Sequence, residues 1–346
     1  MTGAAGSPRP RVVWTFSGQG SQSYGMAREL FETEPAFRKT FLELSSFIEP
    51  ELGSSLADII YSAPPSDAAG SATSTPRVFD NILHTHPALF ITQYAMAEMM
   101  LARGWRPDAV LGYSLGEFVA AAVTEVMTPR QALGAVMRSA RILKEKGPAG
   151  TMAAILTRPD IFEAEQELFA PCVLAASNTA RHFVISGPAA DIERIRLALK
   201  ARSIQLIPLP ISYPFHSPYM EVVRMEFLAI LQDIRLRKPS VPFYSCQQAA
   251  RVGEFESDFF WNVTLDPVDF RGALAAAERD GPWTYLDLGP SGTLCSFARQ
   301  NLLAPSKTPG AERSRSEAIT ILSPFGQDLL GLAAAEKHLG AVGSTA

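Results

Sequence analysis

The chain has 346 residues, of which 47% are hydrophobic and 19% are charged, a composition typical of a globular protein with a large core. Its formal net charge of −4 at pH 7 favours neither nucleic acid nor a membrane surface as a partner. No apolar run approaches the roughly 18 residues of a membrane span, and residues 1–10 lack the apolar segment of a signal peptide. We therefore expect a cytoplasmic protein, in which residues 1–10 form a flexible leader.

The three cysteines, Cys172, Cys246 and Cys295, lie far apart in apolar or strand-like segments and show no CxxC spacing. Cysteines in such segments behave as small core residues in a reducing compartment. We therefore expect no metal site.

Strands and helices alternate along the first part of the chain. An apolar segment runs into the Gly-rich turn at residues 17–22, and the stretch Ser62–Pro76, rich in Ser, Ala, Gly and Pro, is expected to be a surface loop. Apolar runs and helical periodicity define the other elements. They are the strand Val12–Phe16, a helix from about Met26 to Leu44, the helix Ala88–Ala102, the strand Val110–Leu111, a helix that ends at Ala122 and the helix Pro129–Lys144.

The composition changes at Gly147–Gly150, and a different order of elements follows. The order is strand, helix, strand, strand, helix, strand, which is the split ferredoxin-like βαββαβ motif and can be inserted as a unit. The expected elements are Met152–Leu156, Asp160–Leu168, Cys172–Ala176, His182–Ser186, Ala189–Ala201 and Gln205–Pro208. We predict a small subdomain at 149–211, inserted into a large subdomain formed by 11–148 and 212–346.

Alternation of strands and helices resumes after the insert. The expected elements are the helix Tyr219–Leu231, the strand Val241–Ser245, the helix Phe270–Arg279, the strand Thr284–Leu288, a loop at Pro305–Arg315, the strand Ile319–Leu322 and a C-terminal helix. Strands that alternate with helices favour a parallel sheet with helices on its faces. The predicted fold class is therefore α/β, a parallel sheet with a small inserted subdomain.

Ser114 lies in a Gly-x-Ser-x-Gly motif, between an apolar strand and a helical pattern. Glycines on both sides permit a sharp strand-to-helix turn that exposes the serine hydroxyl. The following helix N-terminus offers free N–H groups to a developing oxyanion. The motif indicates a nucleophile, and the alternative is an ordinary turn that carries a serine.

A serine nucleophile needs a general base within hydrogen-bond distance. Among the five histidines, His216 stands out because Pro214, Phe215 and Pro218 surround it and make a rigid loop. His182 and His338 are most simply surface residues. We interpret His216 as the candidate base, and the alternative is a loop histidine with a structural role.

Several short motifs together resemble the malonyl-CoA:acyl-carrier-protein transacylase family, which contains the acyltransferases of fatty acid and polyketide synthesis. The resemblance spans residues 12–340 and implies a large α/β-hydrolase-like subdomain with a ferredoxin-like insert, which agrees with the order of elements. The motifs, in family order, are Phe16–Gln22, Gly112–Glu117, Asn178 followed by Val184–Gly187, Phe215–Met220 and Leu288–Pro290.

The resemblance implies a role for each residue that matches a family motif. Ser114 would be the nucleophile and His216 its base, and the backbone N–H groups of Gln19 and Leu115 would form the oxyanion hole. The family orients its histidine with a backbone carbonyl, which would belong to Asn262 or Val263. Acyl transfer would then proceed by a ping-pong route through an acyl-serine.

The chain departs from the malonyl-specific members at Ser139. Those members carry an arginine that binds the free carboxylate of the substrate, and an ungapped count places Ser139 there, between Arg138 and Arg141. A shift of one residue turns a helical side chain by about 100°, so Arg138 does not simply substitute. A serine offers no charge to a buried carboxylate. The sequence therefore favours neutral acyl groups as substrates. The alternative is a malonyl transacylase in which a one-residue deletion before Arg138 brings this arginine to the carboxylate-binding position.

Two further departures concern the expected acyl pocket. His86 stands where family members commonly have Gln, and Tyr113 stands where His is usual. A neutral imidazole at His86 could hold a water near the acyl-enzyme, and the alternative is a structural histidine at a helix start. The pocket residues implied by the resemblance are His86, Tyr113, Ser139, Asn178 and Phe215.

Together the departures resemble the acyl hydrolase branch of the free-standing, trans-acting polyketide acyltransferases. The substrate would arrive on the phosphopantetheine of acyl carrier protein or on CoA, with no bound cofactor, and the partners would be polyketide synthase modules. A basic helix face is a candidate dock for an acidic carrier protein, formed by Arg194, Arg196, Lys200 and Arg202. A catalytically idle docking subunit is the distant alternative.

Overall fold

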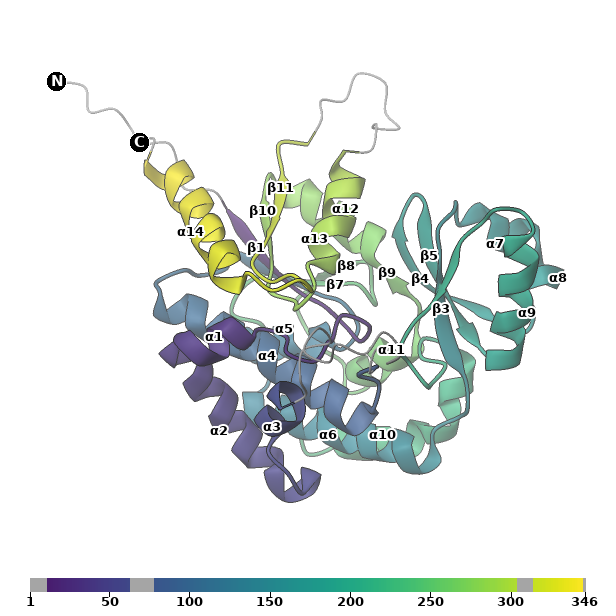
Figure 1. The fold of residues 1–346 in the computed structure, drawn as a ribbon, viewed down its shortest axis with the longest axis horizontal. Helices are drawn as coiled ribbons and strands as arrows, with labels where there is room; N and C mark the ends of the chain where they lie inside the picture. Colours follow the sequence, from purple (N-terminus) through teal and green to yellow (C-terminus); the bar gives the residue numbers. More distant parts are fainter. Residues whose placement is uncertain (1–10, 63–77, 304–313, 345–346) are drawn as a thin grey trace, which may run out of the picture.

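The computed structural model describes residues 11–62, 78–303 and 314–344 (Figure 1). The predicted leader, nearly all of the loop expected at Ser62–Pro76 and most of the loop expected at Pro305–Arg315 lie outside the described residues. Within the described residues, no helix has the length and apolarity needed to cross a membrane.

The larger sheet has the strand order β11-β10-β1-β2-β7-β8. All neighbours pair in parallel except β7 and β8, which are antiparallel. In the pairing of β1 with β2, Phe16 lies opposite Gly112, so the turn after β1 and the serine turn after β2 meet at the carboxyl edge, where open α/β sheets bind ligands. The strands are β1 (Val12–Phe16), β2 (Ala109–Gly112), β7 (Phe243–Ser245), β8 (Ala250–Val252), β10 (Thr284–Asp287) and β11 (Glu317–Thr320).

Helices surround this sheet, and α4 (Ile82–Ala102) is the most deeply buried of the long ones, with apolar or buried residues on every side. The helix predicted from Met26 to Leu44 is in fact two, because Pro35 lacks a backbone N–H and begins a new helix. The helices are α1 (Arg28–Thr33), α2 (Pro35–Leu52), α3 (Leu56–Tyr61), α4, α5 (Gly116–Val123), α6 (Pro129–Lys146), η1 (Pro218–Val223), α10 (Arg224–Leu231), α11 (Phe259–Leu265), α12 (Phe270–Asp280), α13 (Thr293–Leu302) and α14 (Asp328–Ser344).

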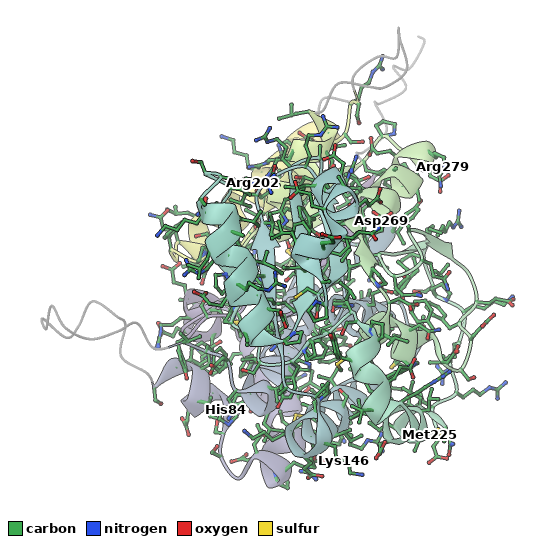
Figure 2. All side chains as sticks on the ribbon, turned by 90° about the vertical axis from the view of Figure 1, so that its right-hand side faces the viewer. His84, Lys146, Arg202, Met225, Asp269 and Arg279 are labelled. Carbon is green, nitrogen blue, oxygen red and sulfur yellow. The ribbon has the colours of Figure 1, made fainter. Side chains whose placement is uncertain are left out.

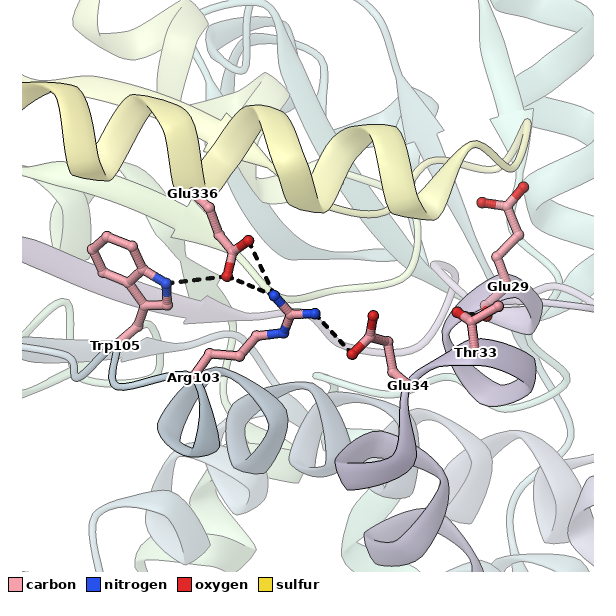
Figure 3. Close-up of polar contacts among 6 residues, drawn as sticks. All are labelled: Glu29, Thr33, Glu34, Arg103, Trp105 and Glu336. Carbon is pink, nitrogen blue, oxygen red and sulfur yellow. Dashed lines mark hydrogen bonds and ion pairs between the residues drawn. The ribbon is translucent and has the colours of Figure 1, made fainter.

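The C-terminal helix α14 is held by Arg103, at the end of α4 (Figure 3). The Arg103 guanidinium donates to Glu336 of α14 at 2.9 Å and to Glu34, between α1 and α2, at 2.8 Å. The indole N–H of Trp105 also donates to Glu336, at 3.3 Å. One arginine therefore links three segments that are far apart in the sequence.

The smaller sheet has the strand order β6-β3-β5-β4-β9 and lies to one side of the molecule (Figure 1). Three helices cover it and enclose a separate core that includes Phe169, Phe183 and Ile195. Its elements are β3 (Thr151–Ile155), α7 (Asp160–Ala164), α8 (Gln166–Phe169), β4 (Val173–Thr179), β5 (His182–Gly187), α9 (Ala189–Lys200) and β6 (Leu206–Pro208). The fold class is therefore as predicted, an α/β-hydrolase-like parallel sheet with a ferredoxin-like insert.

One strand of the smaller sheet was not predicted. The strand β9 (Val268–Asp269) comes from the C-terminal part of the chain and pairs in parallel with β4, with Ala176 opposite Val268. This pairing carries the segment just before β9 to the junction between the two sheets, beside the serine turn.

Candidate active site

Ser114 occupies a strained turn between β2 and α5, with a left-handed φ of 53°. A Cβ on Gly116 would lie 2.0 Å from the carbonyl oxygen of Phe16, and one on Gly112 would lie 2.6 Å from the Cα of Glu117. Only glycine fits at these two positions, which explains the Gly-x-Ser-x-Gly pattern. The close approach of α5 to β1 and β2 maintains the strain at Ser114.

The Ser114 hydroxyl is in hydrogen-bond contact with His216. The distance from Oγ to Nε2 is 2.9 Å, and Nδ1 of the same ring lies 2.9 Å from the carbonyl oxygen of Asp266. A carbonyl can only accept, so Nδ1 carries the proton and Nε2 presents its lone pair to the hydroxyl. Burial lowers the pKa of His216 to about 4, although the hydrogen bond to Asp266 opposes this shift. The imidazole is therefore neutral and able to accept a proton.

The carbonyl that orients His216 belongs to Asp266, so the prediction of Asn262 is wrong. The Asn262 carbonyl accepts from the backbone N–H of Asp266 at 2.8 Å and closes the last turn of α11. Its lone pairs are thus directed along the helix, whereas the carbonyl of Asp266, beyond the helix end, is free to turn towards the ring. The alternative residue, Val263, lines the pocket instead.

Two residues that the sequence analysis missed support this loop. Gln247 donates from its side-chain amide to the Asp266 carboxylate at 2.7 Å, and its backbone N–H donates to the Glu117 carboxyl at 3.0 Å. Glu117 is fully buried, and desolvation raises its pKa to about 8. The sequence signal for this arrangement is limited to a glutamate, Glu117, directly after the serine motif.

The turn after β1 is held by Gln93 of α4. The Gln93 side chain accepts from the backbone N–H of Ser17 at 2.6 Å and donates to its carbonyl at 3.0 Å. Gln19 and Leu115 border the same pocket as Ser114. Among the described residues, neither backbone N–H has a hydrogen-bond acceptor, as an oxyanion hole requires. The role of Gln93 had no recognisable signature in the sequence.

A pocket of about 690 Å³, including its mouth, opens at Ser114 between the two subdomains. None of the described residues that line it is charged, and most are apolar. His86, Tyr113, Ser139 and Phe215 belong to this lining. The full lining is Gln19, His86, Tyr113, Ser114, Leu115, Phe118, Val136, Ser139, Leu143, Met152, Val184, Leu209, Ile211, Phe215, His216, Phe227, Val263 and Thr264.

Asn178 was predicted to line the pocket, but it is not among the residues that do so. Its side-chain oxygen accepts from the Tyr113 hydroxyl at 3.0 Å, and its carbonyl accepts from Asn301 at 2.8 Å. Asn178 therefore connects β4 of the insert to the serine turn and supports the pocket wall from behind.

The two arginines beside Ser139 do not reach the pocket. Ser139 is buried and donates to the Val136 carbonyl at 2.8 Å, whereas Arg138 and Arg141 are exposed. Arg138 donates to a backbone carbonyl of its own helix, and Arg141 pairs with Glu51 at 3.1 Å. Both cations point away from the pocket because α6 presents Ser139 to it.

His86 lies inside α4 instead of at its start, and its side chain is only 7% exposed. The ring stacks on Phe215 with 5.9 Å between the centroids. Desolvation lowers the pKa of His86 to about 3, so its imidazole is neutral at physiological pH.

The basic residues of the insert lie on or just after α9, and Arg202, the last of them, is labelled in Figure 2. Arg194, Arg196 and Arg202 are engaged in ion pairs, whose closest N–O distances are 3.2, 2.6 and 2.6 Å. Lys200 is exposed. The arginine charges of this face are thus partly balanced by neighbouring carboxylates.

The three cysteines are free and buried, as expected of core residues. In the part of the chain that the structure describes, no group of three or more His, Cys, Asp or Glu side chains could hold a metal ion.

Comparison with known proteins connects this chain to one family. Residues 13–320 match the family model described as acyl transferase domain. The chain is 38% identical to the polyketide biosynthesis acyltransferase homolog BaeD of Bacillus velezensis over 314 residues, 91% of this chain and 92% of BaeD. It is 36% identical to the homolog PksD of Bacillus subtilis, over 93% of this chain and 94% of PksD.

Solved structures show the same fold. The acyltransferase domain from the second module of the salinomycin polyketide synthase superposes with a TM-score of 0.79 at 26% identity, over 95% of this chain and 72% of that one. MCAT from Streptococcus pneumoniae has a TM-score of 0.74 at 22% identity, over 94% of this chain and 100% of that one. At that identity the second likeness concerns the fold alone.

Proposed function

The chain belongs to the acyl transferase domain family and is an acyltransferase of polyketide biosynthesis, and we propose that it acts on non-carboxylated acyl groups. The acyl group would arrive as a thioester on the phosphopantetheine of acyl carrier protein, or on CoA, and would be held as an ester on Ser114. The observation that carries this proposal is the uncharged lining of the pocket, with Ser139 where a cation would bind a carboxylate.

The contacts of Ser114 support a two-step reaction. Ser114 Oγ attacks the thioester carbonyl while His216 Nε2, at 2.9 Å, takes the hydroxyl proton. The negative charge on the carbonyl oxygen is met by the N–H groups of Gln19 and Leu115, and one such donor contributes about 3–4 kcal/mol when judged by its removal. The C–S bond then breaks and His216 returns the proton to the thiol. In the second step an acceptor, water or another thiol, attacks the ester by the reverse sequence.

The substrate class follows from the cost of burying an unpaired charge. A carboxylate that enters an apolar pocket without a cation or enough hydrogen bonds loses several kcal/mol of solvation free energy. Arg138 and Arg141 are exposed and face away, and the Ser139 hydroxyl already donates to Val136. Acetyl and longer neutral acyl chains place only apolar atoms in the pocket, so their binding carries no such cost.

Intact-mass spectrometry would test the proposal. The protein is incubated with matched acetyl and malonyl thioesters, and we expect an acetyl adduct that is absent in Ser114→Ala and strongly reduced in His216→Ala. A dominant, stable malonyl adduct would instead establish a malonyl transacylase. Absence of every adduct from the wild-type protein would support the idle docking subunit.

We also propose that acyl carrier protein docks on the basic face of α9. Exposed ion pairs contribute only about 0–1 kcal/mol, so Arg196 and Arg202 can exchange their present partners for carboxylates of a carrier protein. Lys200→Glu combined with Arg202→Glu should raise KM for acyl-carrier substrates and spare acyl-N-acetylcysteamine. Lys39→Glu, on α2 at the far side of the molecule (Figure 1), is the control. Equal loss with both substrates would contradict docking at this face.

A further inference from the structure

Two residues that line the active-site pocket each carry a buried polar atom without a hydrogen-bond partner among the described residues. These atoms are Nδ1 of His86 and the side-chain oxygen Oε1 of Gln19. Both residues line the pocket into which Ser114 and His216 also project. A buried polar atom without a partner costs about 1–3 kcal/mol, so two of them at one pocket indicate a polar ligand.

Each of the two side chains contacts a residue that is adjacent in sequence to another member of the site. The Gln19 amide donates to the hydroxyl of Thr85, the residue just before His86, at 3.4 Å. The His86 ring stacks on Phe215, the residue just before His216. His86 is neutral, as shown above, so it offers one N–H and one lone pair. A small molecule that both donates and accepts hydrogen bonds suits this pair of atoms, and water is such a ligand.

We propose that His86 and Gln19 bind the water that hydrolyses the acyl-Ser114 ester. This inference rests on the proposed acyl-Ser114 intermediate and identifies its acceptor. The water donates one hydrogen to Gln19 Oε1 or to the lone pair of His86, and the other to His216 Nε2. Its oxygen forms a bond to the ester carbonyl as His216 takes that second proton. The bond from the carbonyl carbon to Ser114 Oγ then breaks, His216 returns the proton to Oγ, and a free carboxylic acid leaves.

The imidazole of His86 assists this step without competing as a base. Its burial in α4 and its contact with Phe215 fix the ring, so the water is held in one place relative to the ester. The apolar lining around it keeps other water away. Because acylation of Ser114 uses no water, only deacylation to water depends on His86.

The test separates acylation from deacylation. The full-length protein is acetylated with acetyl-N-acetylcysteamine, and the decay of the Ser114 adduct is followed by intact mass, with and without a thiol acceptor. In His86→Phe we expect the adduct to form at close to the wild-type rate, while its hydrolysis slows about tenfold and the fraction passed to the thiol rises. His86→Gln, which restores polar groups, should recover part of the hydrolysis rate, and His84→Gln on the same helix is the matched control.

The outcomes distinguish this inference from the proposed function. Unchanged hydrolysis and an unchanged partition to thiol in His86→Phe would overturn the water site while the acyl-enzyme stands. Failure of the wild-type protein to form any acetyl adduct would overturn the proposed function itself. If His86→Phe does not fold, judged by circular dichroism, His86→Leu also removes the ring nitrogens, with a smaller side chain, and should likewise slow hydrolysis. Equal hydrolysis rates in His86→Leu and the wild-type protein would then reject the inference.

Discussion

The side-chain amide of Gln247 donates a hydrogen bond of 2.7 Å to the carboxylate of Asp266, the residue whose carbonyl orients His216. Gln247 is in turn held through its backbone N–H by Glu117, on the first turn of the helix that follows Ser114. Starting from the serine turn, this path runs through Glu117, Gln247, Asp266 and His216 back to Ser114. Movement of the α11–β9 loop would therefore alter the distance from the base to the nucleophile.

Replacement of Gln247 tests this path. In Gln247→Leu the Asp266 carboxylate loses its donor, and the loop is free to shift the carbonyl away from His216. A hydrogen bond to a charged group contributes about 1.5–3 kcal/mol, so we expect acylation of Ser114 to slow by roughly 10- to 100-fold, measured as the rate of adduct formation. The exposed neighbour Gln248 supplies the control, Gln248→Leu, which should react normally.

Glu117 makes stability depend on pH. In the unfolded chain its carboxyl ionises near the ordinary value of 4.5, whereas burial raises the pKa in the folded protein to about 8. Between these values the folded state binds more protons than the unfolded state, so the free energy of unfolding falls as pH rises. The slope is at most about 1.4 kcal/mol per pH unit.

The window from pH 7.5 to 8 isolates this effect. His86, His182 and His216, whose pKa values are lowered from 6.5 in the folded protein, are largely neutral in both states there. The pKa values of Asp287 and Asp328 are raised only to about 6. Urea unfolding at several pH values should show falling stability across this window for the wild-type protein and a level profile for Glu117→Gln. A level wild-type profile would contradict a protonated Glu117.

The base should remain active in acid. Because the pKa of His216 is lowered to about 4, its Nε2 lone pair is available at every pH above that value. The rate of Ser114 acylation should therefore fall to half near pH 4, in single-turnover experiments after a brief pH jump, with tryptophan fluorescence as the check that the protein stays folded. An acid limb centred near 6.5 would show that His216 is not desolvated in the working enzyme.

A cation in place of Ser139 should alter the choice of substrate. Ser139 is buried and faces the pocket, so the guanidinium of Ser139→Arg would enter it and pair with a substrate carboxylate. We expect the ratio of malonyl to acetyl adducts to rise at least about tenfold, since such a pair contributes more than about 1.4 kcal/mol. The control is Ser139→Met, which introduces a long side chain without a charge. It should lower the amounts of both adducts without raising the ratio of malonyl to acetyl adducts.

Some features of the site could be predicted because they are local in the sequence. The glycines around Ser114 are required by contacts with Phe16 and Glu117, and they leave a recognisable Gly-x-Ser-x-Gly pattern. His216 could be singled out because prolines and aromatics flank it. Ser139 could be placed by counting along the chain, since the helix that carries it has no interruption.

Other features were decided only by the tertiary structure. A backbone carbonyl carries no side-chain signature, so the choice of Asp266 over Asn262 depended on where α11 ends and which of its carbonyls is used within the helix. The contacts of Gln93 with Ser17 and of Gln247 with Asp266 depend on packing between separate elements.

The sequence by itself determined the order of most strands, the fold class and the candidate serine and histidine, because periodicity, glycine spacing and short motifs are properties of neighbouring residues. Only the tertiary structure decided that these two side chains lie 2.9 Å apart, that Arg138 and Arg141 turn away from the pocket and that one polar atom each of His86 and Gln19 has no partner within the described part of the chain. Each of these depends on how helices and strands pack against one another, which no single segment specifies.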